Sequence, residues 1–428
     1  MDRKSHPTQW RRLDNTAKLF PVIANENLSN VFRVSVTLKE DIIQEILQQA
    51  LEEVLPWFDG FNVRLRRGFF WYYFEGNKKV PIVEKEATYP CKYIDPRSNQ
   101  QFLFRVSYYE KRINLEVFHA ITDGMGAINF LKELTYHYIE LLKMQDSSKK
   151  ISRRPSRECI LDTEDSYLKN YKKVSNKSYS TKKAYQLKGE LLYLDTVSVI
   201  HGYVDLNNLK KKCKEKGVSV TKYLMALLIW CIYEEYLNKQ KYGEPISINL
   251  PINLRSFFES TTTMNFFAIT AIEFLSDGKD YTFEDVLSMV NKQMDENITK
   301  EKLEEIISYN VSNEKKPLVR FAPLAIKYIA LQLVYRRISR RNTMTLSNLG
   351  PIKILPEFEK YIEGFHFIIG VSKKQKMKCG VCSYKDKVVV TFSSVLKDTY
   401  LQRAFFRALT KEGIDVIIES NGVLNEKV

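Results

Sequence analysis

Hydrophobic residues in the first third of the chain follow two different periods. The run VFRVSVTL, at residues 31–38, is rich in β-branched residues and predicts a strand. Residues 39–55 then show apolar positions at helical spacing, and Pro56 marks the end of that predicted helix. A second helix is predicted from about Met125 to Lys143. Between the two helices, strand-like runs occupy residues 62–66, 69–74, 80–84, 102–109 and 112–118.

A similar succession of elements recurs from residue 191 onward. Residues 191–206 predict a strand, and the next helix begins at the capping residue Asp205 and stops at Gly217. A mostly apolar helix is predicted at 220–238. Further helices are predicted at 281–314, 318–340 and 398–412, and further strands at 246–255, 264–275, 343–348, 361–371, 378–384, 387–394 and 415–420.

These elements predict an α/β fold of two similar lobes, each with a mixed sheet and packed helices. Strands that come in hairpin-like runs favour this arrangement over a parallel doubly wound sheet. We place the N-terminal lobe at residues 1–145 and the C-terminal lobe at 191–428. The connecting residues 146–190 are rich in Lys, Arg, Ser, Asp and Tyr, so we expect a crossover segment on the surface.

Composition and charge narrow the class of protein. With 428 residues, 44% hydrophobic and 27% charged, the chain is neither disordered nor fibrous. The formal net charge of +15 suggests an anionic partner, although lysines spread along the chain are equally typical of a solvated surface. The aromatic residues alternate with strand period and read as core, so we expect no nucleic-acid partner.

The cysteines and the apolar stretches indicate the compartment. Six mostly isolated cysteines, and an N-terminus without an apolar run, predict a cytoplasmic protein with reduced thiols. The C-x-x-C at 379–382 lacks a second pair, so we expect no metal there. Arg320 and Lys327 interrupt the most apolar stretch, 317–335, which excludes a membrane span. The basic end of that stretch, 336–341, leaves peripheral contact with an anionic membrane open.

Histidine is scarce, and one of the five occupies a position typical of catalytic groups. His119 follows the predicted strand 112–118, Asp123 stands four residues later, and Gly124 opens a helix. Histidine is the natural general base near neutral pH, and a helix N-terminus favours a developing oxyanion. A buried core histidine stays open as an alternative. A metal site is disfavoured, because the other histidines are scattered.

The segment HAITDG, at 119–124, resembles the HxxxDG motif of the chloramphenicol-acetyltransferase-like superfamily. That superfamily includes peptide-synthetase condensation domains, BAHD acyltransferases, wax-ester synthases and alcohol acetyltransferases. Three further segments resemble it in the same order, at 204–228, 251–267 and 346–352. The closer resemblance is to the stand-alone bacterial alcohol-acetyltransferase-like proteins, through residues 10–21, 68–75, 118–131 and 343–352.

This resemblance implies a tunnel between the two lobes with His119 midway along it. It implies an O-acyltransferase in which His119 acts as general base on a small alcohol or amine. That acceptor would attack acyl-CoA directly, with acyl-CoA as co-substrate and no bound cofactor. In the family the motif aspartate pairs with an arginine, and by position this is Arg255. Contacts to the oxyanion or the substrate would come from the Gly124 N–H, Asn265, Ser347 and Asn348.

The sequence also departs from parts of the superfamily. Phe118 stands where condensation domains usually have another histidine, and the DFGWG motif of BAHD enzymes is absent from the sequence. No neighbouring segment resembles an adenylation or carrier domain, which favours a stand-alone enzyme. A carrier-protein-dependent condensing enzyme and a non-catalytic scaffold stay open as alternatives. For the phosphates of CoA, we expect contacts from the lysine-rich segments 210–216 and 373–378.

Overall fold

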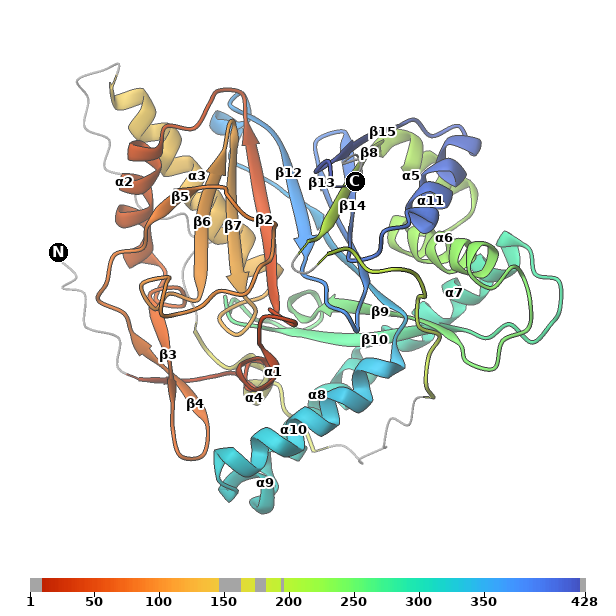
Figure 1. Ribbon diagram of the computed structural model, residues 1–428, viewed down its shortest axis with the longest axis horizontal. Helices are drawn as coiled ribbons and strands as arrows, with labels where there is room; N and C mark the ends of the chain where they lie inside the picture. Colours follow the sequence, from red (N-terminus) through yellow and green to blue (C-terminus); the bar gives the residue numbers. More distant parts are fainter. Residues whose placement is uncertain (1–9, 146–162, 174–181, 194–195, 424–428) are drawn as a thin grey trace.

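The computed structural model describes residues 10–145, 163–173, 182–193 and 196–423 (Figure 1). Most of the predicted crossover segment therefore lies outside the described residues. The elements form two groups that lie side by side, one built from the first third of the chain and one from the last half. Each group holds a sheet and its own hydrophobic core.

The first sheet carries the strand that leads into the HxxxDG motif. Helices α2 (Gln44–Val54) and α3 (Gly124–Gln145) pack together beside it, and α3 contacts its central strands. Apolar side chains of α2 at helical spacing, such as Ile46 and Ala50, are fully buried in this core. The strands are, in spatial order, β12 (Ile362–Ile369), β2 (Val31–Leu38), β7 (Arg112–Phe118), β6 (Phe104–Tyr109) and β5 (Val83–Lys85).

The second sheet is larger and is covered by four helices. These are α5 (Leu206–Glu215), α6 (Val220–Glu235), α7 (Phe283–Asn297) and α11 (Tyr400–Lys411). The strands are, in spatial order, β10 (Phe267–Phe274), β9 (Ile246–Asn253), β11 (Met344–Pro351), β13 (Met377–Tyr384), β14 (Lys387–Ser394), β8 (Ser198–Asp205) and β15 (Val416–Ser420).

Both sheets are mixed, as the strand pattern predicts. In the first sheet β5 runs parallel to β6, whereas the other pairs are antiparallel. In the second sheet β11 runs parallel to both β9 and β13. The strand β12 comes from the C-terminal half of the chain and yet pairs with β2, so the second half completes the first sheet. The boundaries of the two lobes at residues 145 and 191 stay a prediction.

The remaining elements lie around these two sheets. A three-stranded sheet has the order β1 (Arg11–Arg12), β4 (Tyr72–Gly76) and β3 (Val63–Arg67). Short helices are α1 (Phe20–Ile23), α4 (Ser166–Lys169) and five-residue α9 (Pro317–Phe321), with 3₁₀ turns at Leu55–Trp57, Leu254–Ser256, Ser339–Arg341 and Pro356–Phe358. Helices α8 (Lys300–Lys315) and α10 (Leu324–Ile338) run with α9 along one side of the molecule, away from the first sheet (Figure 1).

Two predicted helices are divided in the structure, each for a local reason. The helix predicted at 318–340 breaks between α9 and α10, where Ala322 adopts an extended conformation before Pro323. The helix predicted at 281–314 breaks between α7 and α8, where the Thr299 side chain caps the second helix at the Lys302 N–H. Within the described ranges no single helix is long and apolar enough to cross a membrane; α5 and α6 pass that test only together, and they meet at 83°.

Candidate active site

The HxxxDG segment forms a tight turn between β7 and α3. The His119 N–H donates to the Asn30 carbonyl at 2.9 Å, which fixes the end of β7 beside the start of β2. The Asp123 carboxylate then accepts from the N–H groups of Met125 and Gly126, both at 3.2 Å. These bonds satisfy two of the free donors at the start of α3, so Asp123 is an N-cap as well as a motif residue.

Hydrogen bonds around Asn265 determine which ring nitrogen of His119 carries the proton. The Asn265 Nδ2 group donates to the His119 carbonyl at 3.0 Å and to Asp14 Oδ2 at 3.1 Å. Its Oδ1 lies 2.9 Å from His119 Nδ1 and can only accept. His119 therefore carries its proton on Nδ1 and has a lone pair on Nε2. This is the tautomer that a general base requires.

Asp14 completes this set of contacts and was not among the residues that the sequence singled out. Its side chain is fully buried, and Oδ1 accepts from the Ala17 N–H at 2.7 Å. Burial raises the pKa of Asp14 to about 7, although its hydrogen bonds from Ala17 and Asn265 act in the opposite direction. Asp14 belongs to the segment WRRLDN that carries part of the resemblance, but its partner Asn265 is 251 residues away.

Aromatic rings surround the imidazole. Phe20 of α1 stacks on His119 with ring centroids 4.7 Å apart, Phe32 meets it edge-on at 5.0 Å, and Phe267 lies at 5.3 Å. Burial in this apolar setting lowers the pKa of His119 below its ordinary value, against the opposing effects of Asp123 and Asn265. The imidazole is therefore neutral near pH 7. As a whole residue, His119 is half-buried.

The structure brings Asp123 and Arg255 together. Arg255 Nη1 donates to Asp123 Oδ2 at 2.8 Å, and the same oxygen accepts from the Phe266 N–H at 2.9 Å. Arg255 also donates to the carbonyls of Thr262 (2.9 Å) and Met264 (2.6 Å). The pair therefore fastens the start of α3 to the loop between β9 and β10. These contacts join two segments of the structure and involve neither ring nitrogen of His119.

Two glycines allow α3 to approach neighbouring segments closely. A Cβ atom on Gly124 would lie 2.4 Å from the Leu349 side chain of β11. A Cβ atom on Gly126 would lie 2.5 Å from the Thr263 carbonyl, which cannot move aside as a side chain can. The glycine of the motif thus faces β11. An oxyanion role for the Gly124 N–H stays a prediction.

The other predicted substrate contacts are placed differently. Both amide hydrogens of Asn265 are used by Asp14 and the His119 carbonyl, so in this geometry Asn265 orients the His119 imidazole and has no hydrogen left for an oxyanion. Asn348 Nδ2 donates to Thr221 Oγ1 at 3.0 Å, and its Oδ1 accepts from the Gly350 N–H. Ser347 lies on β11 opposite Gly380. The structure does not bring these two β11 residues into hydrogen-bond contact with His119.

The lysines of the two lysine-rich segments differ in their surroundings. In the segment 210–216, Lys212 pairs with Glu412 and Lys216 with Glu284. In the segment 373–378, Lys378 is deeply set in β13, where burial lowers its pKa to about 8. Its charge also acts to lower the pKa of His119. Lys378 of the second segment therefore acts on His119 electrostatically, whereas residues 373–374 of the same segment are exposed.

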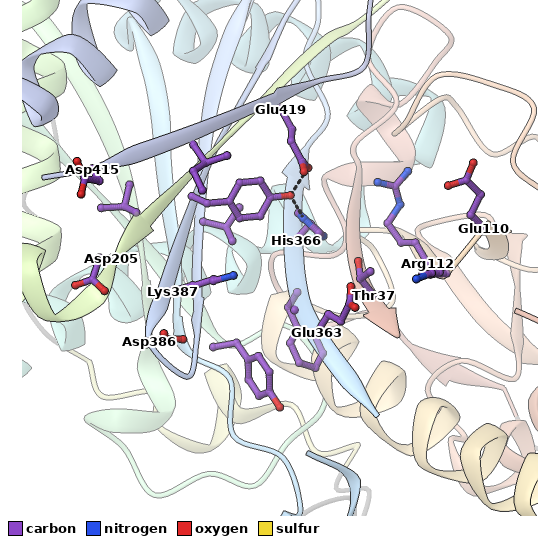
Figure 2. A pocket seen from close by; sticks show the side chains of 18 of the residues that line it. Thr37, Glu110, Arg112, Asp205, Glu363, His366, Asp386, Lys387, Asp415 and Glu419 are labelled. Atoms are coloured by element: carbon purple, nitrogen blue, oxygen red, sulfur yellow. Dashed lines mark hydrogen bonds between the residues drawn. The ribbon is translucent and has the colours of Figure 1, made fainter. Parts of the chain in front are cut away.

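A cavity of about 550 Å³ lies between the two sheets, but not at His119 (Figure 2). Within it, Tyr203 Oη donates to Glu419 and lies 2.7 Å from His366 Nε2. Neither His119 nor Asp123 lines it. Acidic side chains outnumber basic ones on its wall, which does not suit the phosphates of CoA. The acids are Glu110, Asp205, Glu363, Asp386, Asp415 and Glu419, against Lys111, Arg112 and Lys387.

Comparison with known proteins adds to this geometry. No protein-family model and no curated protein matches the sequence. Among solved structures, polyketide synthase associated protein 5 from Mycobacterium tuberculosis matches with a TM-score of 0.61 and 13% identity, over 93% of this chain and 96% of that one. Fusarium sporotrichioides TRI101, solved with coenzyme A and T-2, matches with a TM-score of 0.62 and 10% identity, over 96% and 100%.

A third solved structure is the starter condensation domain of rhizomide synthetase RzmA, in complex with C8-CoA and Leu-SNAC. It matches with a TM-score of 0.57 and 12% identity, over 93% of each chain. At these identities the likeness shows the fold. The chain has the two-lobed fold of the condensation-domain and chloramphenicol-acetyltransferase-like acyltransferases, and at that level the resemblance seen in the sequence is confirmed.

Proposed function

We propose that this protein is an acyltransferase that moves an acyl group from acyl-CoA to the hydroxyl group of an acceptor. The observation that carries the proposal is the set of contacts from Asp14 through Asn265 to His119. It fixes the imidazole as an Nδ1–H tautomer with a free lone pair, in an apolar setting that keeps it neutral.

In the proposed reaction, His119 Nε2 removes the proton of the acceptor hydroxyl as its oxygen attacks the thioester carbonyl carbon. The resulting tetrahedral oxyanion collapses, the C–S bond breaks, and the imidazolium returns the proton to the CoA thiolate. The atoms balance as an ester and a free thiol, without an acyl-enzyme. Asn265 Oδ1 accepts from the Nδ1–H throughout and therefore stabilises the imidazolium that forms between the two proton transfers.

The neighbouring structures support a thioester donor. Two of them were solved with a CoA compound together with a second small molecule, T-2 in one and Leu-SNAC in the other. A small alcohol is the acceptor that we favour for this chain, and an amine would use the same base. The condensing-enzyme alternative shares the geometry and differs only in requiring a carrier-bound thioester.

Thiol release measured with a panel of acyl-CoA thioesters against mixed alcohols and amines tests the proposal. We expect turnover with the wild type and a loss of about 10²–10⁴-fold in His119→Ala. The matched control is His137→Gln, because His137 lies on α3 and contacts Glu53 rather than the site. Wild-type rates in a folded His119→Ala variant would reject the base. Turnover only with a carrier-bound thioester would establish the condensing-enzyme alternative.

A further inference from the structure

Helices α9 and α10 expose an unusual amount of apolar surface. A helix on the surface of a globular protein normally buries one apolar face. In α10 only Leu324 and Lys327 are buried, and α9 buries none of its residues. Large apolar side chains of the two helices are exposed instead, namely Leu318, Val319, Phe321, Ile326, Tyr328, Ile329, Leu333, Val334 and Ile338. Contiguous exposure on this scale marks an interaction surface.

A second segment extends this surface. The hairpin between β3 and β4 exposes Phe69 and Phe70, the former to 72%. The Leu324 N–H donates to the Phe69 carbonyl at 2.8 Å, and Lys327 Nζ donates to the Phe70 carbonyl at 3.0 Å. These bonds fasten the tip of the hairpin to the start of α10. We call the nine helix residues together with Phe69 and Phe70 the apolar ridge.

Basic residues accompany the apolar ridge, and acidic ones are missing from its helices. From residue 315 to 343 the sequence contains eight Lys or Arg and no Asp or Glu. Arg320, Arg336, Arg337 and Arg340 are exposed, and no carboxylate in the described part of the chain pairs with them. Apolar side chains beside unpaired cations match the interface of an anionic lipid bilayer, where tails take the first and headgroups the second.

The charge also argues against a second copy of the chain as the occupant. Two apolar ridges placed face to face would bring together two sets of exposed arginines without any carboxylate between them. Like charges across an interface disfavour association. A nucleic acid would satisfy the arginines but would leave the aliphatic side chains, such as Leu318 and Ile326, in contact with a charged backbone. Of these occupants, an anionic bilayer alone satisfies both kinds of side chain.

The apolar ridge is connected to the candidate active site through α1. Gln332 of α10 donates to the Val22 carbonyl of α1 at 2.6 Å. Two residues earlier in the chain, Phe20 stacks on His119. The aromatic residues that surround His119 therefore lie one short helix away from the apolar ridge.

We propose that the apolar ridge docks this protein on an anionic lipid bilayer, and that the acyl acceptor is a lipophilic alcohol taken from that bilayer. The docking depends only on the ridge. The nature of the acceptor rests on the proposed acyltransferase function, so the two parts are tested by separate measurements.

Flotation with vesicles tests the docking. We expect wild-type protein to float with phosphatidylcholine vesicles that contain 30% phosphatidylglycerol, and to float far less with pure phosphatidylcholine. Leu318→Glu/Phe321→Glu should lower the partition coefficient at least about tenfold, because it places charge where lipid tails are expected. Arg336→Glu/Arg337→Glu/Arg340→Glu should do the same through the headgroups. All five positions are exposed, so folding is not at risk.

Two matched control variants distinguish a specific effect of the apolar ridge and its arginines from a general effect of added negative charge. Val80→Glu/Ile82→Glu adds the same two charges at exposed apolar residues elsewhere. Lys210→Glu/Lys211→Glu/Lys214→Glu makes the same charge reversal on α5, also at exposed positions. Both should float like the wild type. Equal loss in the controls, or no flotation of the wild type, would overturn the docking. So would a dimer, seen by light scattering, that the ridge variants convert to monomers.

Transfer assays then test the acceptor. The variants for this test are Leu318→Glu/Phe321→Glu and Arg336→Glu/Arg337→Glu/Arg340→Glu, here called the ridge variants. With hexadecanol in anionic vesicles as acceptor, their transfer rate should fall at least about tenfold. With a short soluble alcohol, their rate should match that of the wild type. Equal rates on both acceptors would overturn the membrane-derived acceptor while leaving the acyltransferase in place. If neither the wild type nor any variant transfers an acyl group while the wild type still floats with anionic vesicles, the proposed function and its acceptor are overturned. The docking on the bilayer would stand.

Discussion

The ion pair between Asp123 and Arg255 makes a quantitative prediction about stability. Both side chains are largely buried, at 8% and 15% exposure, so removing one partner leaves the other charge poorly solvated. Breaking a buried pair in this way costs about 3–5 kcal/mol. Arg255→Leu should reach this range, because it also removes the donor to the carbonyls of Thr262 and Met264.

The two single variants should not be equal. Asp123→Asn keeps one oxygen to accept hydrogen bonds, and Arg255 keeps its two carbonyl partners, so we expect a smaller loss of about 1–3 kcal/mol. An unfolding entropy of about 2.1 cal/mol/K per residue gives about 0.9 kcal/mol/K for 428 residues that unfold together. The melting temperature of Arg255→Leu should therefore fall by about 3–6 °C.

Thermal and chemical denaturation of the double-mutant cycle measures the coupling. The double variant should be more stable than the sum of the two losses predicts, by about 0.5–3 kcal/mol. Arg66→Leu with Glu75→Gln is the control, because that pair is exposed and should change stability little. If the losses at Asp123 and Arg255 simply add, the two side chains do not act as a pair, and the reasoning is refuted.

Three further predictions concern activity. Burial lowers the pKa of His119 below the ordinary histidine value near 6.5. The acyl-transfer rate should therefore stay high as the pH falls to about 6.5 and should decline only below that pH. A decline centred above pH 6.5 would contradict this. Asn265→Ala should lower kcat by about 10²-fold or more, since neither ring nitrogen would then be fixed as the base, whereas an unchanged kcat would show that Asn265 does not set the tautomer. Lys373→Glu/Lys374→Glu should raise the KM for acyl-CoA with little change in kcat, and added salt should raise the wild-type KM in the same direction; insensitivity to both would exclude this segment.

Much of the fold follows from local patterns. The runs at 112–118 and 387–394 are β7 and β14 with the predicted bounds, because β-branched and apolar residues at strand spacing leave no other regular structure. A local hydrophobic pattern can predict that a segment is a strand, but it does not predict which strand lies beside it. Nothing within residues 361–371 indicates that β12 would pair with β2, since the match depends on where the whole chain returns.

The site shows the same division between local and distant information. His119 and Asp123 could be predicted because the motif is contiguous. Asp14 could not be, because an isolated carboxylate near the N-terminus has no feature that shows it facing Asn265. Lys378 belongs to a lysine-rich run, which predicts a solvated surface. Strand alternation places this lysine on the face opposite the buried Met377 and Cys379, which by itself predicts exposure. That face is covered by β12, and no local pattern shows this.

The helices α9 and α10 illustrate a third case, in which the hydrophobic pattern correctly predicts helix but wrongly predicts burial. Apolar residues at helical spacing normally indicate burial, and the sequence indeed predicts a helix at 318–340. The structure leaves most of those side chains exposed. The eight Lys and Arg between residues 315 and 343 are the feature of the sequence that distinguishes this segment from a core helix such as α6, which has one lysine.

The ion pair and His119 belong to one hydrogen-bonded unit, although Arg255 and His119 are not hydrogen-bonded to each other. Arg255 holds the carbonyls of Thr262 and Met264, and the next residue, Asn265, fixes the tautomer of His119. Asp123 holds Phe266 on the other side of Asn265. Loss of Arg255 therefore releases the loop that places Asn265. Arg255→Leu should accordingly lower kcat as well as stability, and Arg255→Lys should restore stability more than rate, because a single ammonium group cannot hold both carbonyls and the carboxylate in the same plane.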